Sequence, residues 1–149
     1  MTSEFCIAVH ALVFLHHKGT QVSSENLAKN ICTNPARVRK IMAQLKRAGL
    51  VETHEGAEGG YCFKQPAENV TLSEIADAVK AVFVSSAWHS GDTDKPCLVA
   101  SGMGPLMDEV YGELDALCRQ HLGKLTVAEI EKRLCEHRQH SDKTPENKE

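Results

Sequence analysis

Side chains suited to contacts with a nucleic acid are concentrated between residues 34 and 47. An arginine can pair bidentately with guanine, and a recognition helix presents polar and basic side chains to base edges near its N-terminus. The candidates for base contacts are Asn34, Ala36, Arg37, Arg39 and Lys40, with Gln44 one turn further along. The candidates for phosphate contacts are Lys46, Arg47 and Lys64. The pattern favours a DNA-reading surface, although the solvated face of an ordinary helix carries similar charges.

The same segment has the signals of a well-defined helix. Asn34 is a good N-cap, and Pro35 suits the first helical position because an N–H there would have no helical partner. Gly49 suits the residue that follows the end of the helix. Apolar residues recur at helical spacing on the other face: Val38, Ile41, Met42 and Leu45. We therefore expect this face to pack into a core while the basic face stays exposed.

Two further helices are predicted upstream. An apolar stripe indicates a helix from about residue 4 to 17. Ser23 is a good N-cap for a short second helix, and Cys32 and Thr33 form the turn that follows it. Together with the basic segment, these elements make a helix-turn-helix.

A β-hairpin is predicted downstream. Residues 50–54 and 61–64 have an extended pattern, and the turn between them is rich in glycine. A hairpin beside a recognition helix can reach the DNA backbone or the minor groove, so Gly59 and Gly60 at the tip join the candidate DNA contacts. The predicted fold is mainly α with a small β-hairpin wing, that is, a winged helix-turn-helix followed by a long helix.

The C-terminal half is expected to hold chains together. A capping box at Thr71–Glu74 starts a fourth helix to about Val82, and a second one at Thr126–Glu129 starts the last helix. Between them, a long helix carries an a/d-like seam for a partner helix. The seam residues are Met103, Met107, Val110, Leu114 and Leu117. We divide the chain into a DNA-binding domain (1–82), a hinge (83–101), dimerisation helices (102–138) and a flexible tail (139–149).

Charge and composition narrow the functional classes. The net charge is −3, but residues 23–64 contain seven Lys or Arg and four Glu and are therefore locally basic. No apolar run is long enough to cross a bilayer and no signal peptide is recognisable, so we expect a cytoplasmic protein without membrane contact. No phosphate-binding loop or catalytic motif occurs, and we expect neither an enzyme nor a bound cofactor.

Six cysteines occur without close pairs, as expected for resting thiols in a reducing compartment. Cys32 and Cys97 differ from the rest because both are predicted outside regular structure, where a thiol can be oxidised. Lys95 and a following helix start would favour the Cys97 thiolate. Inertness of both thiols remains the alternative. The histidines and cysteines near the C-terminus are too loosely spaced to predict a metal site.

The run LAKNICTNPARVRKIMAQLKRAGLVETHEGAEGGYCF, followed by VTLSEIADAV, resembles the Rrf2 family of bacterial transcriptional regulators. The resemblance covers about residues 4–134. It implies a homodimer in which the long helix crosses to the partner subunit and two winged domains bind a palindromic DNA operator. A regulator of this kind, acting as a repressor, is the expected function.

Two departures from the family pattern stand out. Many members have an arginine ahead of the wing glycines, where this chain has Glu55, with a second acid at Glu58. Cluster-binding members place three cysteines between the fourth and the long helix, where this chain has Cys97 alone. We hypothesise that oxidation links Cys32 to Cys97, within or between subunits, and alters operator binding. Iron–sulfur or other ligand sensing, and a winged-helix protein-interaction module, remain alternatives.

Overall fold

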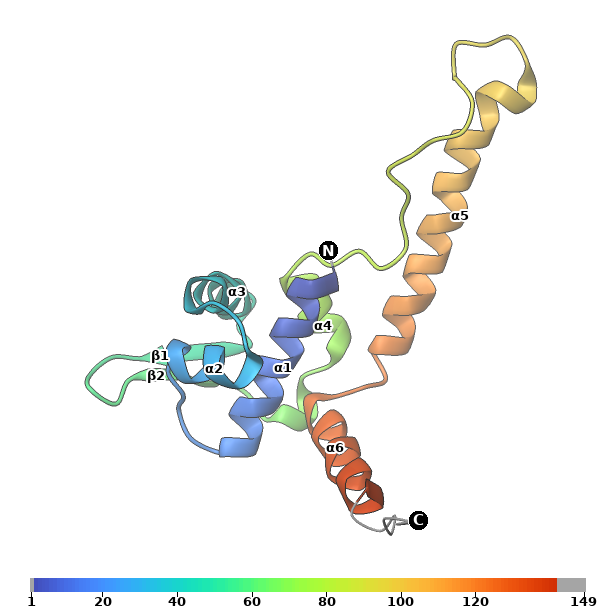
Figure 1. Cartoon of the computed structure of the whole chain (residues 1–149). Helices are drawn as coiled ribbons and strands as arrows, with labels where there is room; N and C mark the ends of the chain where they lie inside the picture. Colours follow the sequence, from blue (N-terminus) through green and yellow to red (C-terminus); the bar gives the residue numbers. More distant parts are fainter. Residues whose placement is uncertain (1, 142–149) are drawn as a thin grey trace, which may run out of the picture.

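The computed structural model describes residues 2–141 and shows a helical body from which one long helix projects (Figure 1). The helices are α1 (Thr2–Lys18), α2 (Ser24–Ile31), α3 (Pro35–Arg47), α4 (Leu72–Ala78), α5 (Leu98–Leu122) and α6 (Val127–Ser141). The strands are β1 (Val51–His54) and β2 (Gly60–Phe63), followed by a 3₁₀ turn at Ala67–Asn69. The predicted winged helix-turn-helix fold with a following long helix is confirmed. No helix in the described range is both long and apolar enough to span a membrane.

The caps of the helix-turn-helix form as their sequence predicts. The Ser23 hydroxyl accepts the Asn26 N–H at 3.2 Å and starts α2. Cys32 is the C-cap residue of α2 and adopts the left-handed conformation at φ 60°. This backbone conformation ends the helix and turns the chain toward α3. The Asn34 Oδ1 accepts the Ala36 N–H at 2.7 Å, with Pro35 in the first turn of α3. Local chemistry therefore fixes both ends of the turn.

The core is aliphatic and lies where α1, α3 and α4 meet. The predicted apolar face of α3 is fully buried, as are Leu12 of α1 and Ile75 of α4. This burial anchors one face of α3 and leaves its opposite face to solvent.

The wing is attached to the body at its base. β1 and β2 pair in antiparallel register, and Tyr61 also exchanges two backbone hydrogen bonds with Val22, at 3.0 and 2.9 Å. This approach requires glycine at position 60, because a Cβ there would lie 2.5 Å from the Val22 carbonyl oxygen. Lys46 Nζ donates to Thr53 Oγ1 at 2.8 Å and ties α3 to β1. The hairpin is thus held beside α3.

Three helix boundaries differ from the sequence prediction. α4 ends at Ala78 rather than near Val82, because Lys80 adopts φ 53° and the Ala81 N–H returns to the Ala76 carbonyl at 2.9 Å. α5 begins at residue 98, inside the predicted hinge. α6 continues to residue 141, so the start of the predicted tail is helical, while residues 142–149 of that tail lie outside the described residues.

α5 projects from the body and is attached to it near its C-terminal half. Asp115 Oδ1 accepts the N–H groups of Phe83 and Val84 at 2.7 and 3.1 Å, and Arg119 pairs with both Asp115 and Asp77. The Phe83 N–H is the main cause that holds the Asp115 pKa below its ordinary value, with the Val84 N–H and Arg119 acting in the same direction. The connection after α4 also contacts the first half of α5, where His89 Nε2 lies 3.0 Å from an Asp108 oxygen. These contacts orient the long helix.

Candidate nucleic-acid interface

The basic side chains of α3 are exposed and rest in weak polar contacts. Arg37 Nη2 donates to Ser3 Oγ at 3.0 Å, and Lys40 Nζ lies 3.2 Å from Glu4 Oε1. Arg39 Nη1 is 3.5 Å from Glu25 Oε1. Exposed ion pairs of this kind contribute about 0–1 kcal/mol. DNA phosphates or base edges can therefore replace these partners at small cost.

Five other predicted contact residues have different surroundings. Asn34 uses its Oδ1 for the helix cap, which leaves its amide NH₂ group available, and Ala36 is exposed beside it. Gln44 is half-buried, and its Oε1 is buried with no hydrogen-bond partner among the described residues, so it is less accessible than predicted. Arg47 is exposed at the end of α3. Lys46 is exposed as well, but its ammonium already contacts the wing.

The two predicted wing glycines lie where the backbone is closely approached by other backbone atoms. A Cβ at Gly59 would lie 2.4 Å from the His54 carbonyl oxygen, and Gly60 packs against Val22. The exposed tip instead presents Glu55 and Glu58. The structure therefore gives Gly59 and Gly60 a positioning role that the sequence pattern did not reveal.

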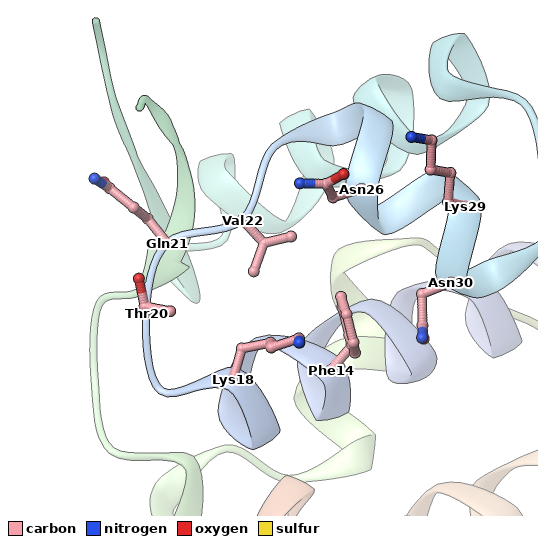
Figure 2. A pocket seen from close by; sticks show the side chains of 8 residues that line it. All are labelled: Phe14, Lys18, Thr20, Gln21, Val22, Asn26, Lys29 and Asn30. Carbon is pink, nitrogen blue, oxygen red and sulfur yellow. The ribbon is translucent and has the colours of Figure 1, made fainter. Parts of the chain in front are cut away.

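A solvent-open hollow of about 550 Å³ lies between α2 and the C-terminal end of α1. Figure 2 shows its side chains, among them Phe14 and Lys18 from α1 and Asn26 and Lys29 from α2. The Lys18 ammonium lies 5.5 Å from the centre of the Phe14 ring. The first two helices therefore leave an open hollow between them, which sequence reasoning did not predict.

The two candidate redox cysteines are exposed, but at separate places. Cys32 lies at the C-cap of α2, and its Sγ is 3.7 Å from the Lys29 carbonyl oxygen. Cys97 is the N-cap residue of α5, where the N–H groups of Ala100 and then Val99 lower the pKa of its thiol. Figure 1 shows α5 beginning at the far end of the projecting arm, away from the α2–α3 turn. A single chain in this conformation does not bring the two thiols together.

The fold and this surface define a winged helix-turn-helix DNA-binding protein, and the comparisons with known proteins agree. The chain belongs to the Rrf2 family, whose model, described as "Iron-dependent Transcriptional regulator", matches residues 1–133. It is therefore a transcriptional regulator by family.

Individual proteins show the same relationship along nearly the whole chain. YwnA of Bacillus subtilis, named as an HTH-type transcriptional regulator, is 25% identical over 130 residues, covering 87% of this chain and 96% of YwnA. A solved regulator structure from Lactobacillus plantarum has a TM-score of 0.75 at 23% identity, covering 95% of this chain and 99% of that one. CymR, the global cysteine regulator of B. subtilis, has a TM-score of 0.66 at 16% identity, covering 89% and 96%. At these identities the two solved structures support the fold.

The iron in the family description has no fitting ligand set in the segment between α4 and α5. Iron–sulfur clusters are held mainly by several cysteine thiolates. This segment supplies one, Cys97, at an exposed helix N-terminus. The next cysteine along the chain, Cys118, is half-buried near the other end of α5. The residues of this segment therefore do not fit a cluster.

Proposed function

We propose that the protein is a homodimeric repressor that binds a palindromic DNA operator and responds to thiol oxidation. The observation that carries the proposal is the exposed basic face of α3 beside an anchored wing, together with the exposed apolar side chains of the projecting helix α5. In this proposal residues 1–82 bind DNA, 83–101 connect, and 102–138 dimerise. A dimer bound at an operator within a promoter would block access of the polymerase.

The DNA-reading role of α3 is tested by Arg37→Ala and Arg39→Ala. Each change is expected to cost about 1–3 kcal/mol of operator affinity if the guanidinium reads a base, which is roughly 5- to 150-fold in Kd. Fluorescence anisotropy measures the affinity for DNA taken from upstream of the protein's own gene. The salt dependence of that affinity reports the number of phosphate contacts. Lys132→Ala is the matched control, because it removes one exposed positive charge from α6.

Unchanged operator affinity in both arginine variants would contradict the role of α3. If the wild-type chain also fails to bind DNA at low salt while it retains a partner protein, the chain is a protein-interaction module instead.

The wing is tested by Glu55→Arg. Two acids at the tip repel phosphates, so reversing one of them is expected to tighten DNA binding. If each wing of a dimer gains one phosphate contact, the slope of log K against log salt steepens by about 2. Glu136→Arg makes the same charge change on α6 and should leave the slope near that of wild type. Weaker binding by Glu55→Arg would show that this carboxylate makes a favourable contact.

We propose that the oxidation signal is a disulfide between Cys32 of one subunit and Cys97 of the other. The lowered pKa of the Cys97 thiol at the start of α5 favours its reactive thiolate form. The crossed dimer helices of our proposal would carry Cys97 toward the partner's reading head. The bond requires the Cα atoms to approach within about 7 Å. Linking a reading head to the dimer scaffold would then change the spacing of the two recognition helices.

A mild oxidant should therefore produce a covalent dimer on non-reducing gels that a thiol reductant reverses. Cys32→Ser and Cys97→Ser should each abolish the crosslink and the change in operator affinity, while reduced-state binding stays near wild type. Cys135→Ser, at another exposed thiol, is the control. Trp88, 75% exposed in the connection before α5, provides a fluorescence signal. An equal response to oxidant in wild type and both single variants would reject this pair.

A further inference from the structure

Three side chains with different metal-binding atoms lie on one face of the wing. The strand register places Glu52 directly opposite Cys62, and His54 follows Glu52 by two residues. Alternation along a strand puts these three on one face, while Val51 and Thr53 point to the other. The buried Val51 and the Lys46–Thr53 hydrogen bond identify that other face as the one toward the body. The Glu52, His54 and Cys62 group, which we call the wing triad, therefore lies on the opposite face, where Glu52 and His54 are exposed and Cys62 is half-buried.

The donor atoms of the wing triad are already near metal-binding separations. Glu52 Oε1 is 3.7 Å from Cys62 Sγ and 3.5 Å from His54 Nε2. All three donor atoms lie within 4.8 Å of one another. A tetrahedral zinc ion with bonds of about 2.0–2.3 Å separates such ligand atoms by roughly 3.4–3.6 Å. Small rotations of side chains at the surface are enough to close the remaining difference.

We propose that the wing triad is a binding site for a zinc-type divalent cation. One thiolate, one imidazole and one carboxylate form a donor set that suits Zn²⁺ rather than Mg²⁺ or Ca²⁺, which prefer oxygen ligands. Three protein ligands leave the fourth tetrahedral position for water or an outside ligand. On binding, the Cys62 thiol gives its proton to solvent and its sulfur bonds to the metal, while neutral His54 and ionised Glu52 bind unchanged.

Occupancy would change the charge of the wing. Without metal and with a neutral imidazole, the wing triad carries one negative charge, from Glu52. With Zn²⁺ bound, the carboxylate and the thiolate balance the cation. The metal would thus remove one negative charge from each wing, next to the acidic tip at Glu55 and Glu58. The metal site itself does not depend on the proposed DNA-binding function.

The site is tested by titrating Co²⁺, a spectroscopic substitute for Zn²⁺, into the reduced full-length chain without DNA. We expect one Co²⁺ per chain, a near-ultraviolet sulfur-to-cobalt charge-transfer band, and visible bands of tetrahedral intensity that Zn²⁺ abolishes by displacement. Cys62→Ser should remove the charge-transfer band. His54→Gln and Glu52→Gln should each weaken binding at least about 10-fold, since even outer-shell changes have effects of that size.

Two control variants separate this site from the other thiols and imidazoles. Cys135→Ser and His89→Gln alter exposed residues outside the wing triad and should leave the titration unchanged. Circular dichroism checks that every variant is folded, and Zn²⁺ should raise the unfolding temperature of wild type but not of Cys62→Ser. The proposal is overturned if wild type shows no thiolate band, or if the band persists in Cys62→Ser.

Discussion

Gly60→Ala is expected to detach the wing from the body and destabilise the protein by about 2–3 kcal/mol. The new Cβ would lie 2.5 Å from the Val22 carbonyl oxygen and 2.9 Å from the Ser23 nitrogen. Both are backbone atoms, so no side-chain rotation can relieve the overlap. β2 must move away from the segment around Val22, and the two hydrogen bonds between Val22 and Tyr61 are then lost.

Chemical denaturation of wild type and Gly60→Ala measures this cost. Gly112→Ala is the control, because a Cβ placed there in the middle of α5 meets no heavy atom within 4 Å apart from its chain neighbours and the backbone of its own helix. Since alanine favours the helix, this control should gain about 0.5–1 kcal/mol. Equal stability of Gly60→Ala and wild type would show that the wing does not need its contact with the body.

The second large effect is expected at the proposed dimer seam, where Leu114→Asp should convert the dimer into a monomer. In the single chain, Leu114 is 43% exposed. Its seam neighbours are exposed as well, Val110 by 37% and Leu117 by 59%. A partner helix would bury this stripe, and an aspartate there would lose its hydration without gaining a partner charge. Each substitution is expected to reduce the free energy of dimerisation by at least about 3 kcal/mol. The dissociation constant of the dimer then rises more than roughly 100-fold.

Size-exclusion chromatography with light scattering measures the mass at micromolar concentration. Ala116→Asp introduces the same charge two residues further along α5, on the side away from the seam, and should remain dimeric. A Leu114→Asp chain that keeps the mass of a dimer would place the interface elsewhere.

The fold was most predictable where its causes are local. Ser23, Asn34 and Thr71 cap helices through side chains that bond within three residues, so a short sequence window contains the whole interaction. The end of α4 was missed because Lys80 occupies a left-handed position that glycine normally marks. The boundary between hinge and long helix was placed late, at residue 101, although a helix start after Cys97 was also considered, because Cys97 forms no side-chain cap that would mark the start.

The site was predictable in residue type but not in its partners. The basic residues of α3 could be singled out from periodicity and charge. The contacts of Arg37 with Ser3 and of Lys40 with Glu4 join residues 34 and 36 positions apart, and no local pattern encodes them. The wing triad had a usable signal, since a hairpin centred on residues 55–59 pairs position 52 with 62. That signal requires the register, which the turn sequence alone left open.

The anchored base of the wing separates two properties of a hairpin that usually change together: the direction in which it points and the distance it reaches. Its direction is set by the hydrogen bonds of Thr53 on β1 with Lys46 and of Tyr61 on β2 with Val22. Both attachments lie outside the turn at residues 55–59. Inserting residues between 55 and 58 leaves these bonds intact, and doubling the length of a loop costs only about 0.6 kcal/mol in closure entropy. Selection can therefore tune how far the tip extends along a groove without redesigning the recognition helix.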